Sequence, residues 1–166
     1  MTSQKSFVSY FRNFVFGVED SLVSTVGLLS GVAAAGVSSS TIFLTGVVLI
    51  FVESFSMATG SFMSEYSADE YTRHTEKPSG RSYRAGAVMF LSYFAFGLIP
   101  LFPYAVLSVE TAFWVSIIAS LFFLFLLGVV GGEIAKIRSF RNGLRMMVLG
   151  GAAIAIGVLV GRLIQK

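Results

Sequence analysis

Five long apolar segments, separated by short polar ones, account for most of this 166-residue chain. Each contains about 20 residues or more, which is enough for a helix to cross roughly 30 Å of hydrocarbon. Because lipid offers no water to satisfy backbone hydrogen bonds, each segment is expected to be helical. The pattern predicts an all-α integral membrane protein in which residues 1–166 form a single transmembrane domain. The five predicted spans are residues 13–35, 41–64, 84–107, 111–132 and 143–163.

The polar stretch that follows the second apolar segment carries acidic residues and a histidine at spacings of four. This spacing predicts that the second helix continues out of the membrane to about residue 76, before Pro78 and Gly80 end it. Pro100 and Pro103 are expected to kink or end the third helix near the opposite surface, because proline removes a backbone donor.

The distribution of Lys and Arg predicts the orientation of the five helices. Ten of the twelve basic residues precede the first segment or lie between segments two and three and between segments four and five. These regions fall on one side of a five-span chain, so the positive-inside rule places the N-terminus in the cytosol and the C-terminus outside or in a lumen. The formal net charge of +3 is therefore attributed to topology, and no nucleic-acid partner is expected.

The composition narrows the classes of function. Hydrophobic residues make up 55% of the chain and charged residues 13%, about half the share that is usual in soluble domains. The chain has no cysteine, which excludes disulfides, zinc–thiolate sites and iron–sulfur clusters. The sequence contains no cofactor motif or nucleophile–base pair, so neither an enzyme nor a permanently bound cofactor is expected.

Glu53 lies in the middle of the second apolar segment. A charged side chain at that depth costs at least about 2.5–3.5 kcal/mol and commonly marks an ion or proton pathway. A purely structural buried acid is the alternative. In hydrocarbon a carboxyl group favours its protonated form, so metal binding to such a group releases a proton. The position of Glu53 therefore predicts coupling between a metal ion and protons.

Asp20 and Met57 complete the predicted metal site. Asp20 interrupts the first apolar segment, and Met57 lies one helical turn from Glu53 on the same face. Helix rise places Asp20 and Met57 at similar depths on two antiparallel helices. Two carboxylates with a thioether suit Fe(II), with Mn(II) and Co(II) as further candidates, better than Mg²⁺ or Ca²⁺.

Further polar residues are candidates for accessory roles. Those near the predicted metal or proton path are Glu19, Ser61, Met63 and Glu65. Those that would gather metal ions at the cytosolic mouth are Asp69, Glu70, His74 and Glu76. A solvated helix face is the alternative for the acidic stretch, and Glu19 could instead face lipid headgroups or Arg84.

Two GxxxG motifs, Gly27–Gly31 and Gly157–Gly161, predict close helix contacts. The contacts could lie within one chain or between two copies. Because one chain supplies few metal donors, we expect a two-fold homodimer that apposes the small-residue faces and places the path on its axis.

Four stretches of the sequence resemble the vacuolar iron transporter family of Fe(II)/H⁺ exchangers. They are FGVEDSLVSTVGLLSGVAAAG (16–36), SFSMATGSFMS (54–64), GLIPLFPY (97–104) and RNGLRMMVLGGAAIAIGVLVGRLI (141–164). The resemblance covers nearly the whole chain in order. It implies five helices in lipid, a homodimer, and movement of metal out of the cytosol into a vacuole or the exterior.

By position, Asp20 matches the family's first-helix acid and Met57 its second-helix methionine, both metal-path residues there. Plant members carry an acid two turns before the methionine, where this chain has Leu49, while Glu53 lies one turn before it. Plant members also carry a long cytosolic metal-binding domain between helices two and three, of which only the short acidic extension is present here.

The sequence thus predicts an antiporter that moves Fe(II), or also Mn(II), out of the cytosol in exchange for protons. A passive cation channel would use the same acids. A membrane scaffold or assembly protein would instead neutralise them in ion pairs. The short chain ends and the missing domain favour a prokaryotic cell membrane; a eukaryotic chain would lie in the vacuolar membrane.

Overall fold

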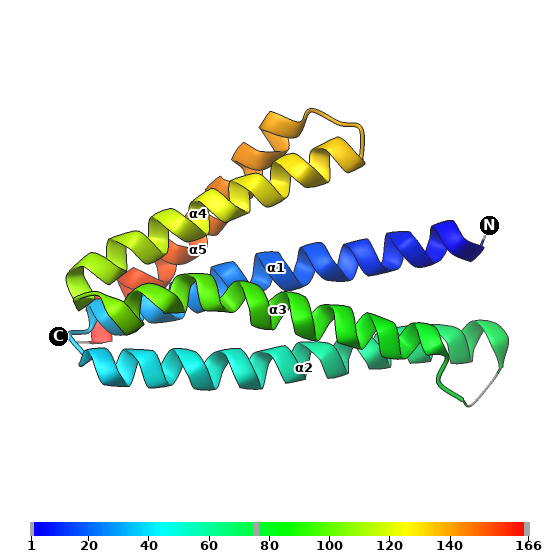
Figure 1. Ribbon diagram of the computed structural model, residues 1–166, viewed down its shortest axis with the longest axis horizontal. Coiled ribbons are helices and arrows are strands. Elements are labelled where there is room, and N and C mark those ends of the chain that lie inside the picture. The colour runs from blue at the N-terminus through cyan, green and yellow to red at the C-terminus, as the bar shows by residue number, and fades with distance from the viewer. Residues whose placement is uncertain (1, 75–76, 165–166) are drawn as a thin grey trace.

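The computed structural model describes residues 2–74 and 77–164, and within these ranges the chain forms five α-helices joined by short connections (Figure 1). All five are long and apolar enough to cross a membrane. The prediction of an all-α protein with five membrane helices is confirmed. The helices are α1 (Thr2–Ala34), α2 (Ser39–Arg73), α3 (Gly80–Val106), α4 (Val109–Ile134) and α5 (Ser139–Ile164).

The helices extend beyond the predicted spans, most of all at α1, which begins at Thr2. The difference arises because helical structure continues into the polar flanks, whereas hydropathy reports only the part that lipid covers. α2 ends at Arg73 and is capped by His74, whose left-handed backbone (φ 53°) lets its N–H bond to the carbonyl of Glu70. The helix therefore stops three residues before the predicted end and five before Pro78.

The prolines of α3 do not end the helix, which continues to Val106 with Pro100 and Pro103 inside it. Of the two predicted effects, that the prolines end the helix is wrong, and that they kink it stays a prediction. Membrane helices tolerate proline where neighbouring groups satisfy the affected backbone. The Ser116 hydroxyl of α4 donates to the Pro100 carbonyl at 2.8 Å, which joins α4 to the proline-containing part of α3.

α1 is the central helix and contacts each of the other four. It contacts α2 less than any other neighbour, because α3 packs against both of them. In Figure 1 the N-terminus and the α2–α3 and α4–α5 connections lie at one end of the bundle, and the C-terminus lies at the other. We call the first of these the basic end, because most of the Lys and Arg residues lie there.

The two GxxxG motifs pack against each other within one chain. A Cβ atom added to Gly157 would lie 2.4 Å from the carbonyl oxygen of Gly27, and one added to Gly161 would lie 2.0 Å from that of Gly31. α1 and α5 therefore touch backbone to backbone at this crossing. The motifs could make contacts within one chain or between two copies. The structure shows the contact within one chain, so the small-residue faces of α1 and α5 already pack against each other at this crossing.

We predict that Gly157→Ala destabilises the protein by about 1–3 kcal/mol, because the added methyl group must push α1 and α5 apart. Thermal unfolding of the purified protein in detergent measures the change. Gly151→Ala, on the same helix, is the matched control, since its Cβ would meet only Leu121 at an ordinary 3.7 Å. Equal melting temperatures for the two variants would show that the crossing does not need glycine.

Candidate functional site

Three carboxylates lie partly buried within the membrane-spanning helices, Glu19 and Asp20 on α1 and Glu53 on α2. Asp20 and Glu53 are close enough for their charges to repel each other, as are Asp20 and its neighbour Glu19. Among the residues that the structure describes, none of the three acids forms an ion pair or a hydrogen bond. The site is therefore a concentration of negative charge that lacks a protein cation.

Tyr93 of α3 is a member of this site that sequence reasoning missed. Its side chain is fully buried (0% exposed), and its hydroxyl lies 2.6 Å from the Ser24 hydroxyl of α1. Its phenol is within electrostatic reach of both Asp20 and Glu53. Its only signal in the sequence is that a tyrosine lies in the middle of an apolar segment. The hydroxyl group of a buried tyrosine usually needs a hydrogen-bond partner.

A groove with a volume of 720 Å³ runs between α1 and α2. Met57 and Ser61 line it from α2, Asn13 lines it from α1, and Met89 lines it from α3. Asn13 Nδ2 and Ser61 Oγ are buried and have no hydrogen-bond partner among the described residues. Buried polar groups rarely remain unpartnered, so this groove has room and free donors and acceptors for water or a hydrated ion.

Asn13 was predicted only as the start of the first span. Its signal in the sequence is weak but present: it lies seven residues before Asp20, which places both on nearly the same face of a helix.

A second, smaller cavity of 220 Å³ lies between α1 and α5. Glu19 and Asp20 line it together with Leu149 and Gly150, so Glu19 turns toward α5 and makes no ion pair with Arg84. Phe16 lines both this cavity and the α1–α2 groove. Asp20 therefore lies beside a cavity on one side and interacts with Glu53 on the other.

The remaining candidates on α2 differ in their surroundings. The Met63 side chain is 48% exposed and does not line the groove, in contrast to Met57. Within residues 2–74 and 77–164, no three Asp, Glu or His side chains gather closely enough to hold a metal ion. Carboxylates and imidazole from one copy of the described chain therefore do not form a closed metal cage.

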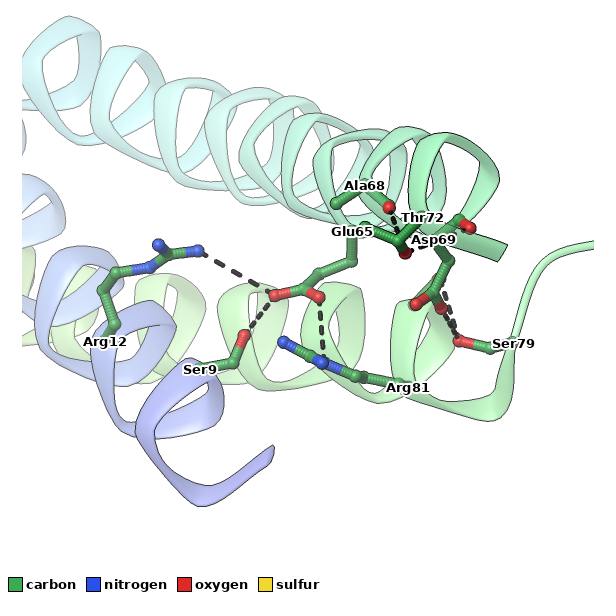
Figure 2. Close-up of polar contacts among 9 residues, drawn as sticks. Ser9, Arg12, Glu65, Ala68, Asp69, Thr72, Ser79 and Arg81 are labelled. Carbon is green, nitrogen blue, oxygen red and sulfur yellow. Dashed lines mark hydrogen bonds and ion pairs between the residues drawn. The ribbon is translucent and has the colours of Figure 1, made fainter. Parts of the chain in front are cut away.

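Glu65 joins three helices at the basic end (Figure 2). Its carboxylate lies 2.9 Å from Arg81 Nε of α3 and 3.8 Å from Arg12 Nη2 of α1, and it accepts a hydrogen bond from the Ser9 hydroxyl. The Arg12 side chain is 70% exposed, so its longer ion pair contributes little, whereas the Arg81 pair is close and more buried. In this structure the charge of Glu65 is neutralised, in contrast to Asp20 and Glu53.

The acidic extension of α2 is not a single solvated face. Asp69 is buried and accepts a hydrogen bond from the Ser79 hydroxyl, which Figure 2 also shows, while Glu70 and His74 are exposed. Glu76 lies outside the described residues. Only Glu70 and His74, of the described candidates for metal recruitment, are freely accessible to solvent.

Comparison with known proteins agrees with this architecture. The model of the VIT family matches residues 11–79 and 71–162, and these two stretches meet near the α2–α3 connection. "Vacuolar iron transporter homolog 3" of Arabidopsis thaliana is 28% identical over 158 residues, which cover 89% of this chain and 79% of that protein. "Vacuolar iron transporter homolog 1" of the same plant is 26% identical over 172 residues, covering 94% and 86%. The structure has five helices long enough to cross a membrane, and the family model matches almost all of the chain. This chain therefore belongs to the VIT family.

Proposed function

We propose that this protein transports Fe(II) across a membrane, and that it moves the ion out of the cytosol in exchange for protons. The relatives named above are iron transporter homologues and not enzymes, which supports metal transport and agrees with the absence of catalytic motifs in the sequence. The positive-inside rule places the basic end in the cytosol, so an ion that enters the groove from that end would move out of the cytosol. Mn(II) and Co(II) are proposed as further substrates.

The observation that carries this proposal is the set of carboxylates without a countercharge. An unpaired buried charge is strongly destabilising, so Asp20 and Glu53 need either protons or a cation. They lie on different helices and repel each other, which makes a cation between them favourable. A divalent metal and protons are therefore alternative occupants of one site, and this alternation is what an exchanger requires.

The groove between α1 and α2 supports a route to that site. It begins near Arg12 at the basic end and passes Asn13 and Ser61 before it reaches Met57, one helical turn from Glu53. Arg12 repels cations at the entrance, but its ion pair with Glu65 is weak and Glu65 keeps Arg81 as its closer partner. Arg12 can therefore swing aside at little cost.

Met57 is proposed as the soft ligand of the site. Its thioether favours Fe(II) over Mg²⁺ and Ca²⁺, which prefer oxygen donors. The donors of one chain do not complete a coordination shell, so water or a second copy must supply the others. We propose a two-fold homodimer for this reason, with the contact away from the occupied crossing of Gly27 and Gly31 with α5.

The alternative of a scaffold protein loses support, because it required the membrane acids to form ion pairs and they form none among the described residues. A passive channel would use the same groove, and only the coupling to protons separates it from an exchanger. As for location, the chain is a multi-pass membrane protein, and the relatives reported above are plant proteins named for the vacuole, so a prokaryotic cell membrane receives no support.

We predict that Glu53→Gln abolishes proton release driven by Fe(II), because the amide cannot give up a proton to an arriving metal ion. The measurement is the change in internal pH of liposomes that contain the purified protein and a pH-sensitive dye. In wild type, a pH gradient alone should drive Fe(II) against its own gradient, which a channel cannot do.

Glu110→Gln is the matched control, since Glu110 is exposed in the first turn of α4, far from the acids in sequence and structure. It should keep wild-type flux. A folded Glu53→Gln protein with unchanged flux would remove Glu53 from the mechanism.

We further predict that Met57→Leu raises the KM for Fe(II) roughly tenfold while that for Mg²⁺, if measurable, stays the same, because the substitution removes a soft donor and keeps the apolar volume. Met63→Leu should leave both values unchanged, since Met63 lies outside the groove. Initial uptake rates over a range of metal concentrations test the pair. Equal effects of the two substitutions would contradict a ligand role for Met57.

A further inference from the structure

A further polar cavity, separate from the groove and the smaller cavity described above, lies at the basic end. It is at the start of α5 and away from the membrane acids. Its volume is 480 Å³, and its lining includes three arginine side chains. Arg138 directly precedes α5, and Arg141 and Arg145 follow it at spacings of three and four, so all three lie on one side of the start of the helix. The cavity is lined by Ile137, Arg138, Arg141, Asn142 and Arg145.

The three guanidinium groups have no protein anion. None of them forms an ion pair with any residue that the structure describes. Glu133 is the nearest acid in the sequence, and its carboxylate accepts a hydrogen bond from the Ser139 hydroxyl at 2.6 Å instead. A cluster of unpaired arginines around a cavity is suited to a phosphate group, because guanidinium matches phosphate oxygens in pairs.

The backbone beneath the cavity is held rigidly. Gly128 of α4 lies so close to Gly143 of α5 that a Cβ added to Gly128 would come within 2.6 Å of the Gly143 Cα. Asn142 Nδ2 donates to the Gly128 carbonyl at 2.8 Å, which fixes α5 against α4 at the same level. The arginines therefore extend from a backbone that is tightly packed, so binding an anion has to order their side chains but not the backbone.

The surroundings of the cavity are apolar on the outer side of the bundle. Ile137 and Phe140, which flank the arginines, are 57% and 71% exposed. Ile137 lies in the α4–α5 connection and Phe140 in the first turn of α5, so both are next to the ends of membrane helices. A phosphate group attached to acyl chains satisfies the arginines and these apolar neighbours together, whereas a free phosphate ion satisfies only the arginines.

We propose that this cavity binds the headgroup of an anionic phospholipid, with Arg138, Arg141 and Arg145 as ligands of its phosphate. The positive-inside rule explains why basic residues lie at this end, but it does not require three of them to share a cavity without a partner. The site is independent of the metal path.

The test titrates the purified protein in detergent with phosphatidylglycerol, with phosphatidylcholine of the same acyl chains, or with inorganic phosphate, and follows the melting temperature. Phosphatidylglycerol should raise the melting temperature by several degrees, because a ligand of the folded state stabilises it. Phosphatidylcholine and inorganic phosphate at the same concentration should not. Equal stabilisation by phosphatidylcholine would overturn selectivity for anionic lipid, and equal stabilisation by phosphate would identify a site for free anions.

The variant R141Q/R145Q should weaken the response to phosphatidylglycerol roughly 20-fold in concentration. K77Q/R84Q is the matched control, because it removes two charges from the same end outside the cavity. Detergent solution avoids any effect of lost charges on membrane orientation. Equal weakening in both variants would show a diffuse charge effect and overturn the site. If R141Q/R145Q fails to fold, the three wild-type titrations still decide the proposal.

Discussion

The close approach of α1 to its neighbours is the constraint on which the rest of this structure depends. In lipid, helices associate through tight packing and hydrogen bonds, since their surroundings are as apolar as their side chains. Gly17 allows α3 to approach and Gly31 allows α5 to approach, because a Cβ added to Gly17 would lie 2.2 Å from Ser92 Oγ and one added to Gly31 would lie 2.7 Å from the Gly157 carbonyl oxygen. A helix packed so centrally places Asp20 beside α2, α3 and α5 together.

The acids of this chain fall into two classes according to their partners. Glu65 is neutralised by arginine and joins three helices, as a buried charge in a stable structure should be. Asp20 and Glu53 have no such partner in the part of the chain that the structure describes, although arginines are available elsewhere in it. This difference supports two roles for the acids. The paired acid, Glu65, holds helices together, whereas the unpaired acids stay available to bind a mobile cation.

The basic residues show a similar division. Arg12 and Arg81 turn inward to Glu65, whereas the arginines at the start of α5 surround a cavity without a protein anion. The positive-inside rule requires only that these charges lie on one side of the membrane. Their separate arrangements arise from packing: α3 brings Arg81 to Glu65, while the tight α4–α5 hairpin holds the other group away from every described acid.

The sequence by itself determined the five membrane helices, the depth of Glu53 and the common face of Met57 and Ser61. These features depend on hydropathy and on the repeat of a single helix, both of which are local properties. Only the tertiary structure decided that the two GxxxG motifs meet within one chain, that Glu65 is neutralised by Arg81, and that Tyr93 lies beside the acids. Such partners come from helices far apart in the sequence, and the packing of all five helices selects which faces meet.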